Sequence, residues 1–424
     1  MIVVWLLNPR LGGKVARRTG SSQIVGLDIG TSKVCVLIAD ERDGELTLLG
    51  FGTAVSSGMR KGAIINLEAV EKAISATVEE AELMAGVGVE RAYVGISGGH
   101  IKSFNSRGSI SLPENHPKIT RDDIASVISA SRAVAIPSDR EVIHLLPQEF
   151  VIDDDHGVHD PLGLSGRRLE VGVHIVTGSS TSIRNVVTCA QNAGLEVVDT
   201  VLLQLAASLS TLSDDEKELG VALLDIGGGT TDVAVHLDGS LWHTAVLPIG
   251  GDHITNDIAV GLRTPIPDAE RIKIEHGAAL SSATTEKGSI EISSIGEGKS
   301  RVVDRDTLIE IINARIEEDI FKLVREELRR KGALHRLNAG IVLTGGTAQL
   351  RGAVDLAEQV FEMPVRVAVP TGFGGIVDAI AKPEFSAVAG LVQFGYDNNK
   401  APAEDSFPQN GPLSRLWHRL RGKS

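Results

Sequence analysis

Short apolar runs alternate with longer amphipathic stretches over most of the chain. Apolar, β-rich runs at Gln23–Asp28 and Lys33–Ala39 are joined by a Gly-Thr-Ser turn and predict a β-hairpin, and Glu45–Ser56 is expected to add a third strand. Apolar side chains then recur at helical spacing across Asn66–Ala85, which predicts a long helix. Strands followed by a helix in this order indicate an α/β chain.

The pattern changes between residues 92 and 170. A short helix with an acidic first turn is predicted at Thr120–Val134, between strand-like runs at Ile101–Leu112 and Glu141–Ile152. A loop rich in glycine and aspartate follows the second run. We interpret residues 92–170 as a small α+β module inserted between two parts of a larger domain.

Regular alternation resumes after this module. The predicted elements are strand Leu169–Thr177, helix Thr181–Gly194, strand Glu196–Val201, helix Leu202–Leu212, paired strands Val221–Ile226 and Asp232–Leu237, helix Asp304–Lys331 and strand Ala339–Thr344. The long helix ends in three basic residues and Gly332, which is a strong C-terminal signal.

Composition and charge narrow the class of protein. Apolar residues make up 42% and charged residues 23%, as in an ordinary soluble protein, and the net charge of −13 argues against a general nucleic-acid coat. The two cysteines, Cys35 and Cys189, are too few for a disulfide framework and fit a reducing cytoplasm. The opening apolar run Met1–Leu7 is far shorter than the ~20 residues of a spanning helix, and its basic residues follow it, so no transmembrane helix or secretion signal is expected.

Two predicted hairpin turns share one chemical pattern. Each has an aspartate at the end of an apolar strand, then glycines and hydroxyl residues, then a second strand. The first contains Asp28, Gly30, Thr31, Ser32 and Lys33, and the second contains Asp225, Gly227, Gly228, Gly229 and Thr230. Glycines let backbone N–H groups approach an anion, and the aspartates can hold Mg²⁺ through water.

One such turn would be an ordinary connection, whereas two in matching context predict a clamp for a polyphosphate. Neither copy has the spacing of a Walker A loop or of a dinucleotide fingerprint. A third turn, Gly345, Gly346 and Thr347, follows the strand Ala339–Thr344 and would let a flat ring such as adenine lie against the backbone.

The order of these three turns resembles the superfamily of actin, sugar kinases and heat-shock chaperones. The resemblance implies an actin-like (ribonuclease-H-like) fold, with two facing α/β lobes that hold ATP and Mg²⁺ in the cleft. It also implies that Glu270 and Lys273 lie on the adenine side, that Gln204 and Asp225 position water or Mg²⁺, and that Asp28 and Asp225 hold Mg²⁺ through water. The helices that connect the lobes would be Leu202–Leu209 and Ser386–Leu391.

Within that superfamily the chain resembles FtsA, the actin-like family of bacterial cell-division proteins. Gly58-Met-Arg-Lys-Gly62, Leu146-Pro-Gln-Glu-Phe150 and Asp160-Pro-Leu-Gly-Leu-Ser-Gly166 carry this resemblance, together with a basic tail after a linker. It implies filaments on the cytoplasmic face of the anionic inner membrane at the division site. These filaments would tether the tubulin-like FtsZ and recruit other division proteins through residues 92–170, with slow ATP hydrolysis at most.

The family's expected contact with the acidic C-terminal peptide of FtsZ lies in residues 252–330. Lys299, Arg301 and Arg305 form a basic cluster there that can meet carboxylates, although a solvated charge run is an equally good interpretation. The acidic loop around His156 and His159 could suggest a metal site, but a solvated loop is favoured because no further metal motif accompanies it.

The resemblance divides the chain into nine segments. They are an extension expected to be disordered (1–22), the first-lobe core (23–91), the inserted module (92–170), the return to the first lobe (171–201), the second-lobe core (202–251), the upper subdomain of the second lobe (252–332), the second-lobe core with its return to the first lobe (333–396), a flexible linker (397–411) and a basic helix (412–424).

The basic segment at the end of the chain has the pattern of an in-plane membrane helix. Leu413, Leu416, Trp417 and Leu420 share one helical face, and Arg415, Arg419, Arg421 and Lys423 add positive charge without any acid. A helix docked on its own protein is the alternative. The linker argues against it because it spans roughly 20–25 Å as a flexible coil, which lets the tail reach a bilayer.

Other functions on the same fold fit less well. A small-molecule kinase of the sugar-kinase type lacks a convincing sugar-binding cluster and gains nothing from a basic tail. A chaperone ATPase would need a peptide-binding domain, and too few residues follow Gly395 for one. An actin-like adaptor of another envelope assembly, such as pili, is opposed by the family-like stretches and the tail.

Overall fold

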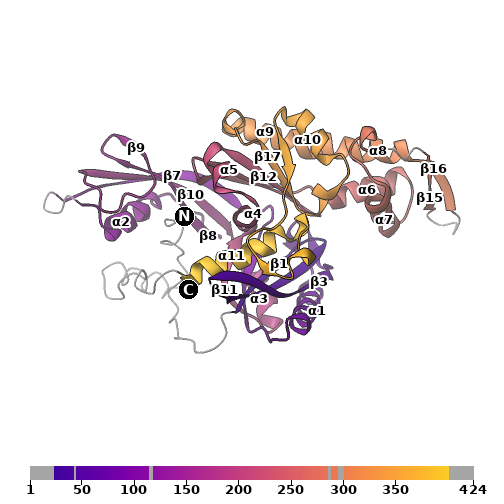
Figure 1. The fold of residues 1–424 in the computed structure, drawn as a ribbon, viewed down its shortest axis with the longest axis horizontal. Helices are drawn as coiled ribbons and strands as arrows, with labels where there is room; N and C mark the ends of the chain where they lie inside the picture. Colours follow the sequence, from indigo (N-terminus) through magenta and orange to yellow (C-terminus); the bar gives the residue numbers. More distant parts are fainter. Residues whose placement is uncertain (1–22, 43, 114–117, 285–287, 295–299, 401–424) are drawn as a thin grey trace.

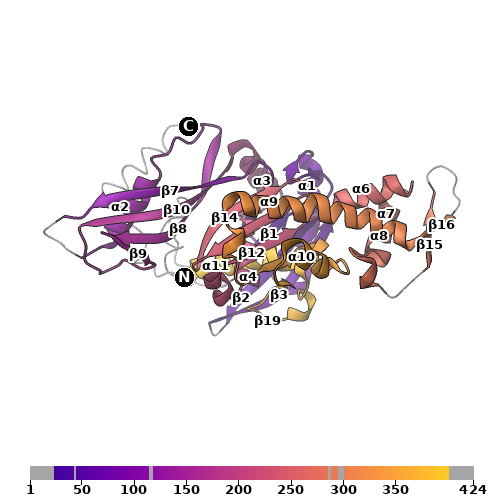
Figure 2. The ribbon, with the colours of Figure 1, turned by 90° about the horizontal axis from the view of Figure 1, so that it is seen from above.

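The computed structural model describes residues 23–42, 44–113, 118–284, 288–294 and 300–400. They form two lobes stacked on each other and a module that projects from one end (Figure 1). The hairpin of β15 (Ser289–Ser293) and β16 (Ser300–Asp304) lies at the end opposite that module (Figure 2). The molecule is therefore elongated, with the two lobes between its two extremities.

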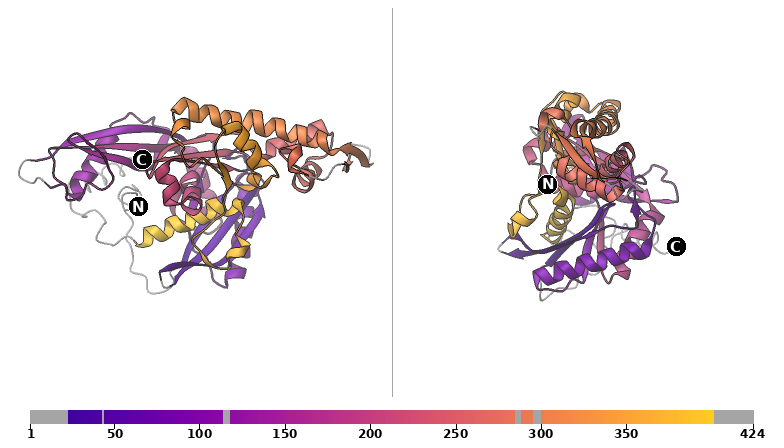
Figure 3. Two further views of the ribbon diagram at one scale, coloured as in Figure 1. Left: turned by 45° about the horizontal axis from the view of Figure 1, so that its top comes forward. Right: turned by 90° about the vertical axis from the view of Figure 1, so that its right-hand side faces the viewer.

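The first lobe is built on a mixed sheet of six strands. Their order is β11 (Glu196–Leu202), β6 (Arg91–Ile96), β1 (Gln23–Ile29), β2 (Lys33–Arg42), β3 (Glu45–Val55) and β19 (Gly374–Gly375). Helices α1 (Leu67–Ala85) and α3 (Ser180–Asn192) cover one face, and α4 (Leu203–Thr211) and α11 (Ser386–Lys400) cover the other (Figure 3). A small hairpin, β4 (Met59–Arg60) and β5 (Ala63–Ile64), precedes α1.

Local signals explain the bounds of α1, which differ from the predicted Asn66–Ala85 only at the cap. The Asn66 side chain accepts a hydrogen bond from the Ala69 N–H, and Gly86 closes the helix in the left-handed conformation at φ 69°. The buried side chains between them form one stripe against the sheet.

The inserted module is a second sheet with one helix. Its strand order is β7 (Lys102–Ser111), β10 (Arg168–Ser179), β8 (Arg140–Ile152) and β9 (Asp155–Val158), and α2 (Arg121–Ser131) covers it after a capping box at Thr120. Two predicted boundaries change. Strand β6 belongs to the first lobe, so the module begins after it, and β10 stays in the module to Ser179. His156 lies in β9, an exposed strand that pairs with β8, so the segment predicted as a solvated loop is partly a strand.

The second lobe repeats the sheet-and-helix design. The order of its strands is β14 (Ser240–Leu247), β13 (Thr231–Leu237), β12 (Val221–Ile226), β17 (Ile341–Thr344) and β18 (Val365–Val367). The remaining helices are α5 (Asp214–Leu219), α6 (Gly251–Gly261), α7 (Ile266–His276), α8 (Arg305–Ala314), α9 (Lys322–Lys331) and α10 (Ala353–Phe361). A π-helical stretch at Arg315–Phe321 joins α8 to α9, so the predicted long helix is continuous but not uniformly α-helical.

The two lobes are joined where α4 and α11 cross. A Cβ atom on Gly390 of α11 would lie 1.7 Å from the backbone oxygen of Ala206 in α4, so only glycine allows this approach. Both predicted connecting helices exist, but α11 continues to Lys400. The predicted linker 397–411 therefore begins inside a helix, and its remainder lies outside the described residues.

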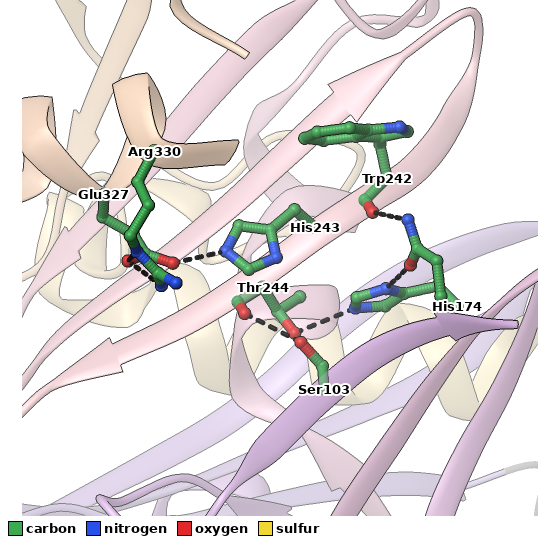
Figure 4. Close-up of polar contacts among 8 residues, drawn as sticks. Ser103, His174, Trp242, His243, Thr244, Glu327 and Arg330 are labelled. Carbon is green, nitrogen blue, oxygen red and sulfur yellow. Dashed lines mark hydrogen bonds and ion pairs between the residues drawn. The ribbon is translucent and has the colours of Figure 1, made fainter. Parts of the chain in front are cut away.

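The inserted module docks on the second lobe through side chains that bind the backbone of edge strand β14 (Figure 4). Ser103 Oγ donates to Thr244 O at 2.9 Å, and Asn105 Nδ2 donates to Trp242 O at 3.2 Å. Gln148 Nε2 donates to the same Trp242 oxygen at 3.1 Å. These contacts satisfy carbonyl groups that an uncovered edge strand would leave open.

His174 lies buried at the centre of this interface. Its Nδ1 is 2.6 Å from Asn105 Oδ1, and its Nε2 is 3.0 Å from Thr244 Oγ1. Because Asn105 Oδ1 can only accept, Nδ1 carries the proton and Nε2 accepts from the Thr244 hydroxyl. Burial, with smaller contributions from His243 and Lys331, lowers the pKa of His174 to about 3, so the ring is neutral.

Substitutions of two buried histidines should distinguish the stability that comes from their hydrogen bonds from the stability that depends on their protonation. At pH 7.5, His174→Leu should lower the unfolding free energy by about 1–3 kcal/mol because Asn105 and Thr244 lose a buried partner. His236→Leu, in β13, should be neutral or stabilising, because neither ring nitrogen of His236 has a hydrogen-bond partner. Urea unfolding of the full chain measures both changes.

Acidification gives a second readout of the same variants. Burial also lowers the pKa of His236 to about 3, below the ~6.5 of an unfolded histidine. The stability that each neutral ring contributes is complete above pH 6.5 and is lost as the pH falls toward 3, at about 1.4 kcal/mol per pH unit. Each variant should therefore lose less stability than the wild type between pH 7.5 and 5.5. Identical losses in all three proteins would contradict the neutral buried rings.

Candidate functional site

The two predicted phosphate hairpins face each other across the junction of the lobes. The β1–β2 hairpin carries Asp28, and the β12–β13 hairpin carries Asp225 at the corresponding strand end. Asp232 lies directly opposite Asp225 in the register of the second hairpin. Three carboxyl groups therefore gather at the ends of strands from both lobes.

The third carboxylate is held by side chains from three parts of the chain. Ser97 Oγ donates to the two oxygens of Asp232 at 2.7 and 2.8 Å, and Gln204 Nε2 donates to Asp232 Oδ1 at 2.7 Å. The Thr230 hydroxyl donates to the same group at 3.4 Å. Ser97 follows β6 and Gln204 lies in α4, so both side chains reach this carboxylate from outside its hairpin.

Burial raises the pKa of all three carboxyl groups. The pKa of Asp28 rises to about 6 against the lowering effect of Lys33, and the pKa of Asp225 rises to about 8 because Asp232 and Asp28 add to the effect of burial. Burial raises the pKa of Asp232 to about 7, although the hydrogen bond from Ser97 opposes it. A cation placed here would offset both the desolvation and the repulsion.

Several buried polar atoms at this point have no hydrogen-bond partner. They are Asp28 Oδ1, Lys33 Nζ and Gln204 Oε1. The Lys33 ammonium lies 4.2 Å from the centre of the Phe385 ring and 3.5 Å from Glu384. Acceptors without a hydrogen-bond partner, beside an ammonium whose ion pair with Glu384 is long, fit a ligand that combines an anion with a cation, as a polyphosphate with Mg²⁺ does.

The glycines of the second hairpin allow the two hairpins to touch. A Cβ on Gly228 would lie 1.8 Å from Ser32 Oγ, and one on Gly229 would lie 2.4 Å from Thr31 Oγ1. Across the same contact, Ser32 Oγ donates to Asp252 Oδ1 at 3.0 Å. These glycines thus serve the contact between lobes as well as the predicted approach of an anion.

The predicted adenosine residues cluster beside the second hairpin. Gly345 has φ 83°, a left-handed conformation suited to glycine, and its Cβ position would be 2.3 Å from Asp225 Oδ1. Thr347 Oγ1 donates to Gly227 O at 3.2 Å, and Gly346 has open space where a Cβ would be. The role of this loop in holding an adenine ring stays a prediction.

Glu270 and Lys273, on α7, meet α6 at the same place. Lys273 Nζ donates to Gly251 O at 3.1 Å and to Thr255 Oγ1 at 2.8 Å, and it forms an ion pair with Glu270 at 2.7 Å. The structure therefore brings the sequence-predicted residues of both phosphate hairpins, the adenosine loop and α7 together at the junction of the lobes.

The predicted basic cluster for a partner peptide is only partly accessible. Lys299 lies outside the described residues, and Arg301 donates to Leu262 O. Arg305 is buried, with Nη2 3.1 Å from His276 Nδ1, so it does not form part of an exposed cluster as predicted. The periodicity of the helix alone could not show this, because the partner His276 comes from another helix, α7.

Sequence reasoning did not identify Asp232 and Ser97 as site residues. Asp232 pairs with Asp225 in the second hairpin, whereas Cys35 pairs with Asp28 at the same place in the first. Comparison of the two hairpin sequences therefore did not point to Asp232. Ser97 and Asp232 are 135 residues apart.

The predicted membrane residues in 412–424 lie outside the described part of the chain. Within that part, no three or more His, Cys, Asp or Glu side chains are grouped to hold a metal ion, so the Mg²⁺ role of Asp28 and Asp225 stays a prediction.

Sequence comparison links this chain to one family. The family described as "Cell division protein FtsA" matches residues 222–390, and the "SHS2 domain inserted in FTSA" matches residues 98–177. Cell division protein FtsA of Pseudomonas aeruginosa is 46% identical over 94% of this chain and 96% of its own length. The Escherichia coli K12 protein of the same name is 38% identical over 90% of this chain and 92% of its own.

Solved structures show the same actin-like fold at low identity. The type IV pilus biogenesis complex PilM–PilN aligns with a TM-score of 0.61 at 16% identity, covering 88% of this chain and 98% of that one. MreB5 of Spiroplasma citri bound to ADP aligns with a TM-score of 0.54 at 16% identity, over 89% and 98%. The MamK double helical filament gives 0.53 at 14% identity, over 88% and 98%.

Gly250→Ala tests the contact between the first turn of α6 and the second hairpin. The Gly251 and Asp252 N–H groups donate to Gly227 O and Gly228 O, each at 2.9 Å. A Cβ on Gly250 would lie 2.5 and 2.7 Å from these same oxygens, so the helix must move away. We expect the unfolding free energy to fall by about 1–3 kcal/mol in urea unfolding.

A matched control is Gly99→Ala, whose Cβ would meet open space. This change should stay within about 0.5 kcal/mol of the wild type. Equal stability of both variants would show that α6 is not held against the hairpin in this way.

Proposed function

The chain belongs to the FtsA family of cell division proteins, and from that membership we propose that it binds ATP with Mg²⁺, assembles into filaments on the inner face of the cytoplasmic membrane and tethers FtsZ there. The observation that carries the nucleotide part is the contact between two glycine hairpins, beside buried Asp28 and Lys33 atoms that have no hydrogen-bond partner. MreB5, which shares the fold, is bound to ADP in its structure, and this supports a nucleotide in the same cleft.

In this proposal each predicted residue has a physical role. Backbone N–H groups of Gly30–Lys33 and Gly227–Thr230 bind the phosphates, and Lys33 adds the charge of its ammonium. The adenosine part lies against Gly345–Thr347 and α7. Mg²⁺ held through water by Asp28 and Asp225 would neutralise phosphate charge.

Gln204 is suited to position a water molecule. Its amide nitrogen donates to Asp232, and this bond orients the side chain so that Oε1, which is buried and unpaired, faces away from Asp232. An oriented acceptor of this kind can hold the water that attacks a terminal phosphate. Asp225, with its raised pKa, is a second candidate for this role. We propose slow ATP hydrolysis at most.

The tail at 412–424 is the proposed membrane anchor. Its apolar face would enter the bilayer interface, and each basic residue near an anionic surface would add on the order of 1 kcal/mol. In the described residues, no helix is long and apolar enough to cross a membrane. One short helix binds weakly, whereas a filament presents many copies at once, so assembly would make the attachment strong.

The partners follow the same division of the chain. The FtsZ C-terminal peptide is proposed to bind within residues 252–330, where Arg301 is the exposed and described member of the predicted basic cluster. Other division proteins would bind the inserted module. The MamK filament supports self-association of this fold. The PilM–PilN structure, which would favour the pilus-adaptor alternative, is 16% identical to this chain, against 46% and 38% for the two division proteins.

Co-sedimentation with anionic liposomes in MgATP tests the anchor. The full chain should pellet and carry an FtsZ C-terminal peptide with it, and a chain ending at Asn410 should stay in solution. Trp417→Glu should release the full chain because it places a charge on the apolar face, whereas Trp417→Phe should still pellet. If Trp417→Glu pellets as well as the wild type, the tail is not the anchor.

A further inference from the structure

The small hairpin before α1 has an unusual turn. Its strands pair Met59 with Ile64 and Arg60 with Ala63, which leaves Lys61 and Gly62 as a two-residue loop. Both have positive φ, 50° and 74°, as in a type I′ turn. Asparagine followed by glycine is the favoured pair for this turn, and lysine adopts the left-handed conformation less readily. The turn itself therefore does not explain a lysine at its first position.

The tip of this hairpin is wedged between the two phosphate hairpins. The Gly62 N–H donates to Thr31 Oγ1, in the first phosphate hairpin, at 3.2 Å. A Cβ on Gly62 would lie 3.4 Å from Thr230 Cγ2, in the second, and 2.7 Å from Gly98 Cα. These contacts fix the backbone next to Lys61 relative to both lobes.

The Lys61 side chain is exposed at this place. It makes no hydrogen bond or ion pair with any residue that the structure describes. Burial lowers the pKa of His253, in the first turn of α6, and the nearby Lys61 charge lowers it further. The next residue toward the N-terminus, Asp252, accepts the hydrogen bond of Ser32. The free ammonium therefore lies near the mouth of the cleft, beside the phosphate hairpins.

The contacts of the tip also show which end of a nucleotide it would meet. Gly62 packs against Gly98, which directly follows Ser97. Ser97 and Gln204 both donate hydrogen bonds to Asp232. These groups surround the site proposed for the attacking water, whereas the adenosine loop packs against Asp225 and Gly227. A cation at the hairpin tip is thus on the side of the terminal phosphate.

We propose that Lys61 binds the terminal phosphate of the nucleoside triphosphate and gives the cleft its preference for ATP over ADP. This inference rests on the proposed function of the cleft. A lysine ammonium on a flexible stem is a good point-charge partner for phosphate oxygens. The inner phosphates are already provided for by the two hairpins and Lys33, so loss of Lys61 removes a contact that only the triphosphate makes.

Affinities of the full chain for ADP and ATP, each with Mg²⁺, test the proposal by isothermal titration calorimetry. Lys61→Asn removes the charge and suits the type I′ turn, so folding is preserved or improved, which urea unfolding checks. We expect the Kd for ATP to rise about tenfold, as for loss of one charge-assisted contact, and the Kd for ADP to change less than about twofold. Lys61→Arg should restore most of the preference.

Two further variants make the outcome specific. Arg60→Asn removes one charge from the same hairpin and should leave both affinities unchanged. Lys33→Met should weaken ADP and ATP alike. Equal Kd ratios for ATP and ADP in the wild type and in Lys61→Asn would overturn the role of Lys61 while leaving the nucleotide site intact. Failure of the wild type to bind either nucleotide would overturn the proposed function and this inference together.

Discussion

The structure depends on holding three carboxyl groups together at the junction of two lobes. Burial opposes the ionised forms of Asp28, Asp225 and Asp232, and repulsion from neighbouring carboxylates adds to this at Asp225 and Asp232. Packing elsewhere must offset this cost. The close contacts between the lobes include two that leave no space for an added Cβ atom, at Gly228 between the hairpins and at Gly390 between α4 and α11.

The inserted module shows a different kind of contact. It interrupts the first lobe in sequence, yet its sheet binds edge strand β14 of the second lobe through Ser103, Asn105 and Gln148. Strand β14 lies two strands from β12, which carries Asp225. The inserted module, which is proposed to bind partners, is thereby fixed to the second lobe, which carries the hairpin with Asp225. His174 makes the tie dependent on a neutral ring, because both of its nitrogens are used.

Sequence identity shows the family of this chain, and the contacts of the site residues explain some of the family's motifs. Identity of 46% and 38% over most of the chain establishes the family, whereas the similar solved structures, at 14–16% identity, establish only the fold. The residues of the cleft then give physical reasons for the family's motifs. Gly62, at the end of a family-like stretch, is needed because the hairpin tip packs against Gly98 and Thr230.

Local patterns in the sequence determined most of the secondary structure and located the two glycine hairpins of the candidate site. The spacing of apolar residues located α1, β12 and the continuous α8–α9 segment, and the repeated Asp-Gly turns located both hairpins that are proposed to bind phosphate, because each signal lies within a few neighbouring residues. The tail pattern is equally local, and its function stays a prediction.

Tertiary structure alone decided which distant residues share a surface. It assigned β6 to the first lobe and all of β10 to the module, it buried Arg305 under α7, and it brought Ser97 and Gln204 to Asp232. It also placed the Lys61 turn between the phosphate hairpins. Periodicity reports which face of an element is apolar but not which other element covers it. Contacts between residues more than a hundred positions apart therefore leave no trace in a single sequence.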